Sequence, residues 1–374
     1  MDFAFTQEQD ALRELARSIL EDKVTHDKLK ALEAEGQWLH RGAWSELAKA
    51  SLLGVALPEK HGGSGLGLIE LCLVLEQVGR TVAPVPVLAS LALGALPVDK
   101  FGSAAQQRKL LPGVASGEVI LTAALSEPGN DDPTTPTTVA RRDGGMWRLD
   151  GEKTCVPAAD IATAVIVPAR TTDGVGLFLV DPQGSGATVA RQILTNREPH
   201  AQLTLSGVAA EPIGDPSANG ESVRWLWERA LAAYCAVQVG VCDRALRMTA
   251  EYTIGRLQFD KPIASFQAVH QRAADAYIDL EAMRLSTWEA VYRLSEGLPA
   301  TDAVVIAKFW AAEGGQHVAV ASQHLHGGIG VDVDYPLHRY FVWAKHIELM
   351  LGGAAPQLAR LGRGLAADPA FAAT

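Results

Sequence analysis

The chain carries, at residues 252–267, the sequence Tyr-Thr-Ile-Gly-Arg-Leu-Gln-Phe-Asp-Lys-Pro-Ile-Ala-Ser-Phe-Gln. This stretch is polar, is broken by Pro262, and separates two long segments whose apolar residues recur at helical spacing. It is therefore predicted to be a loop between two helices. Arg256 lies where the first helix would end, and by itself it has the character of an ordinary surface arginine at a helix C-terminus.

Four long segments with helical periodicity lie in the last two-fifths of the chain. They cover residues 223–252, 266–295, 300–325 and 337–351. Four long helices in succession predict a helix bundle. The small-residue tail after Gly364 is expected to fray.

The order of the preceding segments excludes a doubly wound sheet, which would need alternating strands and helices. Residues 6–111 have helical spacing, whereas residues 119–208 hold short apolar or alternating runs at 119–125, 162–167, 176–180 and 203–208. The prediction is an α+β chain with a helical N-terminal domain (1–118), a middle β domain (119–220) and a C-terminal four-helix bundle (221–374). The glycines between 62 and 67 do not follow a strand as a dinucleotide fingerprint would, so they predict a loop.

The composition of the chain argues against several classes of function. A net charge of -10 argues against nucleic-acid binding. The uncharged run 81–98 has the length of a membrane span, but its three prolines predict a buried connector rather than a membrane segment. The four cysteines form no CxxC pair and suggest no metal site, and the N-terminus is acidic and amphipathic, so a cytoplasmic protein with reduced thiols is expected.

The stretch 252–267 resembles the signature YxxxRxQFGxPIxxFQ of the acyl-CoA dehydrogenase family, and it differs only at Asp260, where the family has Gly. Similar stretches follow the family order along nearly the whole chain. Residues 54–63 resemble its first Gly-rich loop, Ser126-Glu127-Pro128 its TEP segment, and residues 326–330 its HGGxG turn. The resemblance implies the same three-domain fold.

The resemblance also implies a chemistry that this chain lacks the base to perform. In the family a carboxylate removes the α-proton of an acyl-CoA thioester while the flavin accepts the β-hydrogen as hydride. The two family positions for that carboxylate correspond to Leu351 and Ala230. Neither side chain can take a proton, so no catalytic residue is assigned.

Two nearby carboxylates are alternatives. Glu228 is two residues from Ala230, a rotation of roughly 200° on a helix, and is expected to be an exposed partner of a basic group. Glu348 is three residues before Leu351 and would share its helical face at about 5–6 Å, which makes it a weak candidate for a displaced base; the alternative interpretation, which is favoured, is a solvated helix charge.

The segments that contact the flavin ring in the family are altered. Its KxWIT segment corresponds to residues 153–157, where Cys155 replaces the Trp and Pro157 the Thr. The family's GSD segment is absent and acidic residues lie in its place, whereas Ser126 keeps the hydroxyl of the TEP threonine. A ring held here would lose stacking and hydrogen bonds.

The segments that serve a neighbouring subunit are kept. The family shares each FAD across a dimer, and the resemblance assigns the pyrophosphate to Arg256. Close backbone approach is assigned to Gly327 and Gly328, and His324 stands where the family usually has Gln. The residues that would line the adenosine side are Gln258, Phe259, Phe266 and Gln267.

This combination resembles the non-catalytic subunit of the actinobacterial α2β2 acyl-CoA dehydrogenases that act on steroid side chains. The implied partner is a sister acyl-CoA dehydrogenase subunit that binds most of the acyl-CoA and shares FAD with this chain. Two alternatives remain: a self-sufficient enzyme with a displaced base, and a flavin-free scaffold or CoA-ester-binding protein. Asp260 could repel the ADP arm, or the family Gly could serve only the loop conformation.

Overall fold

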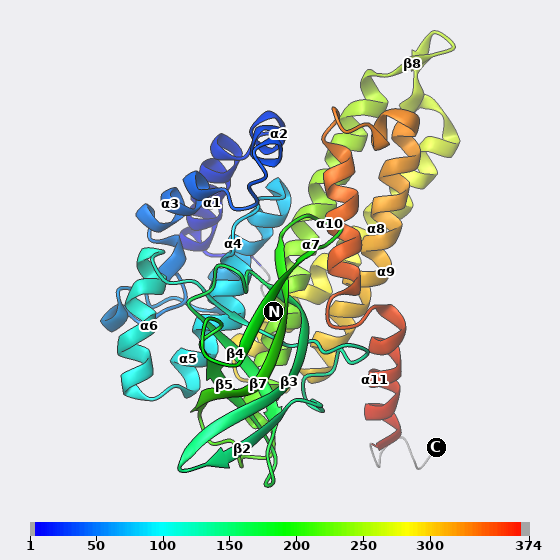
Figure 1. The fold of residues 1–374 in the computed structure, drawn as a ribbon. Helices are drawn as coiled ribbons and strands as arrows, with labels where there is room; N and C mark the ends of the chain where they lie inside the picture. The colour runs from blue at the N-terminus through cyan, green and yellow to red at the C-terminus, as the bar shows by residue number, and fades with distance from the viewer. Residues whose placement is uncertain (1–3, 368–374) are drawn as a thin grey trace. The chain divides into compact units, whose positions relative to one another are not determined.

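The structure is a computed structural model that describes residues 4–367. The chain forms two compact units. Of the described residues, the first unit comprises 4–23, 27–74 and 84–230, and the second comprises 24–26, 75–83 and 231–367 (Figure 1). Two helices, α4 (Leu68–Thr81) and α7 (Glu221–Gly255), begin in the first unit and end in the second.

The helices of the first unit, apart from α4 and the start of α7, are short to medium in length. They are α1 (Gln7–Lys23), α2 (His26–Ala34), α3 (Arg41–Lys49), α5 (Leu96–Phe101) and α6 (Ala104–Ser116). Ser103 and Gln106 form a capping box at the start of α6, and Gly117 ends that helix with a φ of 80°. The predicted buried connector contains a π-helix, Leu88–Ala95, whose residues from Ala89 onward are all buried. None of the helices in residues 4–367 is long and apolar enough to cross a membrane.

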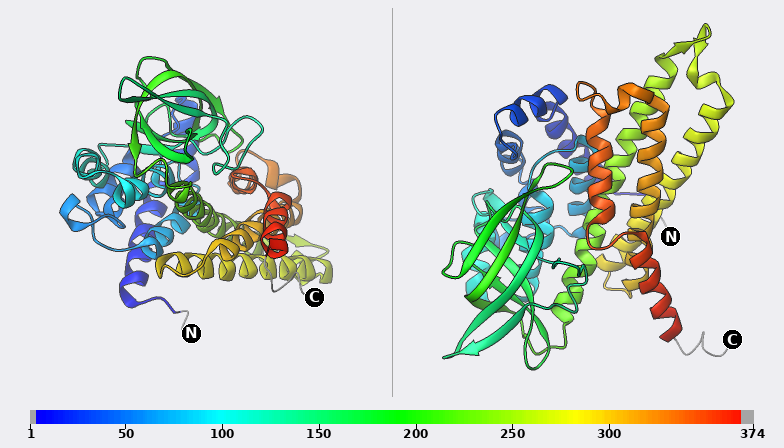
Figure 2. Two further views of the ribbon diagram at one scale, coloured as in Figure 1. Left: turned by 90° about the horizontal axis from the view of Figure 1, so that it is seen from below. Right: turned by 45° about the vertical axis from the view of Figure 1, so that its right-hand side comes forward.

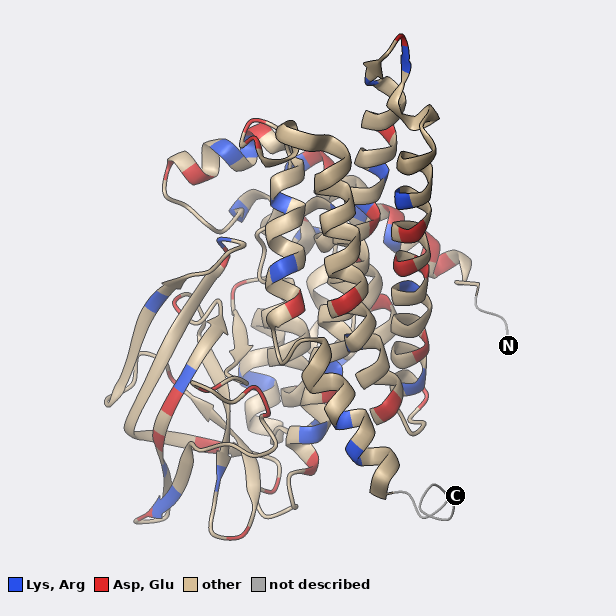
Figure 3. Ribbon diagram, turned by 90° about the vertical axis from the view of Figure 1, so that its right-hand side faces the viewer, with Lys and Arg blue, Asp and Glu red and all other residues tan. Residues whose placement is uncertain are grey.

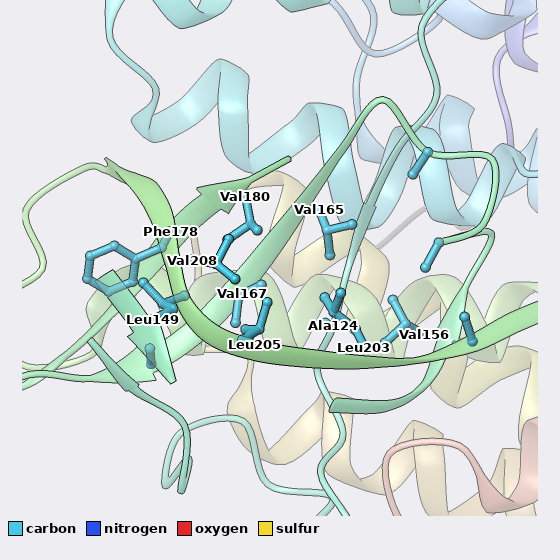
Figure 4. Close-up of a cluster of buried hydrophobic side chains, with 14 of the residues drawn as sticks. Ala124, Leu149, Val156, Val165, Val167, Phe178, Val180, Leu203, Leu205 and Val208 are labelled. Carbon is cyan, nitrogen blue, oxygen red and sulfur yellow. The ribbon is translucent and has the colours of Figure 1, made fainter. Parts of the chain in front are cut away.

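The β part of the first unit is a seven-stranded sheet that curls on itself. Its strands are β1 (Leu121–Ala123), β2 (Val139–Asp143), β3 (Met146–Pro157), β4 (Ala164–Arg170), β5 (Val175–Val180), β6 (Ala187–Ile193) and β7 (Pro199–Ile213). Their order is β1-β4-β2-β3-β7-β5, and β5 also pairs with β4, so five strands close into a barrel while β6 extends from β7. Inward-facing apolar side chains, among them Phe178, Val165 and Leu203, fill the interior (Figure 4).

The second unit is a bundle of long helices. After α7 come α8 (Gln267–Ser295), α9 (Thr301–His326), α10 (Leu337–Leu349) and α11 (Ala354–Ala367). These helices lie alongside one another (Figure 2), with acidic and basic residues interspersed along them (Figure 3). A short hairpin of β8 (Leu257–Gln258) and β9 (Lys261–Pro262) connects α7 to α8.

Glycines and one buried amide set the spacing of these helices. A Cβ built on Gly240 of α7 would lie 1.9 Å from the carbonyl oxygen of Glu76 in α4, so the two backbones are in direct contact there. The buried Gln238 amide donates to the carbonyls of Ala311 in α9 and Ala344 in α10, at 3.0 and 3.3 Å. The bundle core is therefore fixed by close backbone approach as well as by apolar packing.

An ion network joins three helices in the same unit. The Asp243 carboxylate of α7 accepts from Arg80 of α4, from Arg247 at 2.9 Å and from Arg284 of α8 at 3.0 Å. These arginines lower the pKa of Asp243 even though burial alone would raise it. The carboxylate stays ionised and holds the helices in register.

Most of the predicted elements are present, and several were missed. The four long helices are α7 to α10, but α10 ends at Leu349 instead of 351. Three strands (β2, β3, β6) and α11 were not anticipated. The prediction that the tail frays after Gly364 is wrong for residues 365–367, because α11 is helical up to Ala367. The rest of the tail lies outside the described residues. The three-domain division stays a prediction.

Candidate functional site

The Arg256 segment folds as a tight hairpin. The backbone N–H of Arg256 donates to the Tyr252 carbonyl at 2.8 Å, and Leu257 and Gln258 pair with β9. The two turn residues, Phe259 and Asp260, have φ values of 53° and 59°. A two-residue turn with both central residues at positive φ suits a hairpin, and aspartate tolerates this conformation better than most residues. Asp260 thus occupies a left-handed turn position, at which a glycine would also adopt the conformation that the loop requires.

The side chains of this hairpin are available to a ligand. Arg256 and Gln258 are exposed, and Phe259 is 86% exposed. No residue in the described part of the chain forms an ion pair or side-chain hydrogen bond with the Arg256 guanidinium. Phe259 packs edge-on against the half-buried Phe266 at 6.2 Å, with the Lys261 ammonium 4.7 Å from the Phe266 ring centre. A cationic and aromatic surface results.

The glycine turn after α9 is equally open. Gly327 has a φ of 65°, and its N–H donates to the carbonyls of Gln323 and His324. A Cβ on Gly327 or Gly328 would meet nothing within 4 Å, and both glycines and His324 are exposed. Ligand atoms could approach this backbone closely.

A ring stack brings the two segments together. Tyr252 lies parallel to His326, with ring centres 4.5 Å apart and planes at 19°. His326 Nδ1 lies 2.8 Å from the Ser322 carbonyl, and Nε2 lies 3.1 Å from the Tyr335 hydroxyl. Burial lowers the pKa of His326. No role for these residues is predicted from the sequence, although Tyr252 and His326 each open a family motif.

The residues expected near a flavin ring lie together in the first unit. The N–H of Thr154 donates to the Ser126 carbonyl at 3.0 Å, which joins the TEP-like and KxWIT-like segments. Cys155 is half-buried at a φ of 50°, and its N–H donates to Gln192 Oε1 at 2.8 Å. The Pro157 carbonyl accepts from Thr122. Ser126 itself is only 5% exposed.

A buried ion pair in these two segments was not predicted. Lys153 Nζ lies 2.7 Å from Glu127 Oε1, with side chains 0% and 2% exposed. The carboxylate also accepts from the backbone and hydroxyl groups of Thr137 and Thr138. Burial would raise the pKa of Glu127, but Lys153 and the threonines outweigh it and lower the pKa to about 2; burial lowers the pKa of Lys153 to about 8. The only sequence signal was their place inside family motifs.

The two positions for a catalytic base are buried and apolar. Ala230 is fully buried in α7. Leu351 is 2% exposed and lies after the end of α10 at a φ of 57°. Its carbonyl and that of Gly352 accept from the Gln357 amide at 3.0 and 3.2 Å. These contacts give the loop a defined conformation without placing a carboxylate in it.

The expected geometry of Glu348 is wrong. Because α10 ends at Leu349 and Leu351 is left-handed, the helical spacing that would put Glu348 and Leu351 on one face does not apply. The Glu348 side chain is 18% exposed and pairs with Lys345 Nζ at 2.7 Å, so it is not a solvated helix charge either.

Glu228 is half-buried rather than exposed. Its carboxylate raises the pKa of the neighbouring Arg229, although burial is the larger effect and lowers that pKa to about 10. The expected partnership with a basic group is present, but the expected exposure is not, because this part of α7 is packed on several sides.

Comparison with known proteins identifies the family. Models of the N-terminal, middle and C-terminal domains of acyl-CoA dehydrogenase match residues 6–118, 122–208 and 225–366. Acyl-CoA dehydrogenase FadE27 of Mycobacterium tuberculosis is 39% identical over 378 residues, covering 99% of this chain and 100% of that protein.

Two solved structures support the same family assignment. A variant of the Tcur3481-Tcur3483 steroid ACAD is 46% identical with a TM-score of 0.92, covering 96% of this chain and 98% of that one. The ChsE4-ChsE5 complex from Mycobacterium tuberculosis is 39% identical with a TM-score of 0.94, covering 99% and 100%. The predicted α+β fold and the flavin oxidoreductase class are confirmed. PigA, which has the same fold at 24% identity, has been solved as a complex with FAD. The chain is a member of the acyl-CoA dehydrogenase family.

Proposed function

We propose that this chain is the non-catalytic subunit of a heteromeric, FAD-dependent acyl-CoA dehydrogenase, and that it completes the FAD site of a sister subunit. The observation that carries the proposal is an asymmetry within the chain. Its neighbour-serving segment is open and cationic, whereas its own base positions are Ala230 and Leu351.

The adenosine-side residues fit the ADP arm of FAD. The Arg256 guanidinium is exposed, and its planar fork can donate to two pyrophosphate oxygens at once. The open backbone at Gly327 and Gly328 permits close approach of a phosphate or ribose. Gln258, Phe259, Phe266, Gln267 and His324 would line the adenosine side.

The ring-side residues do not fit the isoalloxazine. Cys155 offers no aromatic surface, and the N–H of this residue is already bound by Gln192. Pro157 has no hydroxyl, and Ser126, although kept, is almost fully buried. When bound, FAD accepts the hydrogen removed from the β-carbon of the acyl-CoA; this chain is proposed to bind and orient the adenosine end only.

The proposed partner is a sister acyl-CoA dehydrogenase chain in an α2β2 assembly, which would bind most of the acyl-CoA. Similarity to the Tcur3481-Tcur3483 steroid ACAD and to the ChsE4-ChsE5 complex supports a heteromer and a steroid side-chain CoA ester. Large apolar side chains on α7 and α8 support burial by another chain, since Ile254, Ile278 and Leu285 are each more than 60% exposed.

Two further features belong to the proposal. The division into domains 1–118, 119–220 and 221–374 is retained, and the protein is proposed to be cytoplasmic, with neither nucleic acid nor membrane as a partner. Its net charge of -10 supports the absence of nucleic acid.

The test is the flavin absorbance and stoichiometry of the chain purified alone and co-expressed with its sister chain. We expect the lone chain to be colourless and the complex to hold about one FAD per heterodimer. A lone chain that is fully loaded with flavin and is bleached by acyl-CoA would contradict the proposal and favour a displaced base, for which Glu348→Gln would abolish the bleaching.

A further inference from the structure

We infer that Tyr252, His326 and Tyr335 form a positioning cluster that fixes the Arg256 hairpin and the Gly327–Gly328 turn as one preformed surface for the ADP arm of FAD. The inference rests on the proposed function, because it explains how this chain would present that surface. These three residues are positioning residues: they act through Arg256 and the glycines.

Tyr252 is linked directly to the hairpin. It lies in the last turn of α7, and its carbonyl accepts the N–H of Arg256 at 2.8 Å. The carbonyl of Arg256 in turn accepts the N–H of Ile263 at 2.8 Å, which closes the base of the hairpin. The position of the Tyr252 backbone therefore determines the position of the Arg256 backbone, from which the guanidinium side chain extends.

His326 is linked directly to the glycine turn. It is the last residue of α9, immediately before Gly327, and it is 4% exposed. A carbonyl oxygen can only accept, so the Nδ1 atom that faces Ser322 carries the hydrogen, and Nε2 accepts from the Tyr335 hydroxyl. The imidazole is thus held at both edges by hydrogen bonds.

The faces of the imidazole are constrained as well. The Tyr252 ring covers one face at 4.5 Å and 19°, and the Tyr335 ring lies 5.3 Å from the imidazole at 51°. Tyr335 also lies edge-on to Tyr252 at 6.4 Å. Three rings from α7, α9 and the loop before α10 therefore form one rigid group, in which a movement of one motif would displace the other.

The glycine turn needs such an anchor. Gly327 and Gly328 have no side chains to pack, and the space around their Cβ positions is empty. Glycine has the largest backbone freedom of any residue, so an unanchored turn would lose more entropy when it binds a ligand. A stack that fixes the residue before the turn lowers this cost and favours binding.

The competing explanation is that the stack only stabilises the bundle. Both explanations predict lower stability for Tyr252→Ala, so stability alone does not separate them. They differ in two readouts: the local opening of residues 327–331 in the folded chain, and the affinity of the assembled complex for FAD.

The first experiment measures amide hydrogen exchange in the lone folded chain for Tyr252→Ala, Tyr252→Phe and Tyr335→Phe. The matched control is Tyr277→Ala, which removes an exposed tyrosine of α8 outside the cluster. We expect faster exchange at 257–263 and 327–331 in Tyr252→Ala, rescue by Tyr252→Phe, which keeps the ring, and an intermediate effect for Tyr335→Phe. Unchanged exchange at 327–331 in Tyr252→Ala would overturn the inference.

The second experiment measures the FAD dissociation constant of the complex with the sister chain, with size-exclusion chromatography to verify assembly. We expect Tyr252→Ala to weaken FAD by about threefold to tenfold, as for the loss of one aromatic contact, and Tyr252→Phe to restore it. If Arg256→Ala weakens FAD but Tyr252→Ala does not, the positioning role is wrong and the proposed function stands. If neither variant changes FAD binding, both are wrong.

Discussion

At the scale of single residues, the proposed role depends on the contrast between one exposed cation and two buried apolar side chains. Arg256 is exposed and has no partner among residues 4–367, so its charge is free to meet an anion. Leu351 and Ala230 are buried and chemically inert. Residue identity at these three positions is the basis for assigning a binding role without a catalytic one.

Arg256→Ala is expected to weaken FAD binding by the complex. A hydrogen bond to a charged group contributes about 1.5–3 kcal/mol, which corresponds to roughly tenfold to hundredfold in the dissociation constant. Flavin fluorescence titration measures this change, and Arg256→Lys should recover part of it. Arg293→Ala, which removes an exposed arginine paired with Glu289, is the control. Equal flavin content in Arg256→Ala and the unmodified complex would favour a flavin-free scaffold.

The buried pair of Glu127 and Lys153 gives a second prediction at this scale. Lys153→Met leaves a buried carboxylate without its counter-charge, and breaking such a pair typically costs about 3–5 kcal/mol. Urea unfolding measures the loss. The control is Lys49→Ala, which removes the exposed pair with Glu46 and should cost about 1 kcal/mol or less. Equal stabilities would mean that the β-domain pair is not a stabilising contact.

At the scale of elements, the β8–β9 hairpin explains the one departure from the family signature. Phe259 and Asp260 both adopt positive φ. Asp260→Gly should leave the hairpin intact. Asp260→Ala should cost up to about 1–2 kcal/mol of hairpin stability, because alanine lacks the short polar side chain that lets aspartate adopt the left-handed region. Hydrogen exchange at residues 257–263 measures both changes. Equal hydrogen-exchange rates in Asp260→Gly and Asp260→Ala would mean that the left-handed conformation does not determine which residues are tolerated at position 260.

Glu198, just before strand β7, and His200, within it, affect stability with opposite pH dependence. Burial lowers the pKa of His200 from 6.5 to about 4, so the unfolded chain binds a proton between these values that the folded chain does not. The contribution of His200 to the stability of the fold therefore falls as the pH drops from 6.5 to 4. Burial raises the pKa of Glu198 from 4.5 to about 8. The contribution of Glu198 to the stability of the fold therefore falls as the pH rises from 4.5 to 8. Glu198 keeps part of its surface exposed, so its effect should be the smaller.

These opposing effects predict how two variants behave between pH 4.5 and 6.5. Compared with the unmodified chain, Glu198→Gln should show stability that rises more steeply with pH, by up to about 1.4 kcal/mol per unit, because of this pair only His200 then titrates. His200→Gln should show stability falling with pH over the same range. Urea midpoints in a series of buffers measure both slopes. Parallel curves for the two variants would contradict the assignment.

At the scale of the whole molecule, backbone contact between helices sets the stability of the second unit. Gly240→Val places atoms against the Glu76 carbonyl, where a Cβ alone would lie at 1.9 Å. We expect a loss of more than about 3 kcal/mol, in the range of severe overpacking. Thermal unfolding measures it. Gly255→Ala, in the same helix with nothing within 4 Å, should be neutral or slightly stabilising. A mild effect of Gly240→Val would show that α4 and α7 can separate at little cost.

The sequence by itself determined the class of fold, the succession of helices and strands, and the family. Helical periodicity and a motif such as residues 252–267 are local features, so they can be recognised before any tertiary contact is known. The same local information singled out Arg256 and the glycine turn, and it marked Ala230 and Leu351 as the positions where a base is proposed to be missing. It missed the strands β2, β3 and β6, whose residues gain their pattern only from pairing with neighbours.

Only the tertiary structure decided the contacts between residues distant in the chain. Spacing could not show that Tyr252 stacks on His326 or that Lys153 neutralises Glu127, because each depends on how separate elements pack. Nor could it show that α10 stops before Leu351. Side-chain identity is written in the sequence, whereas burial, pairing and left-handed backbone conformations arise when the whole chain satisfies its packing and hydrogen bonds together.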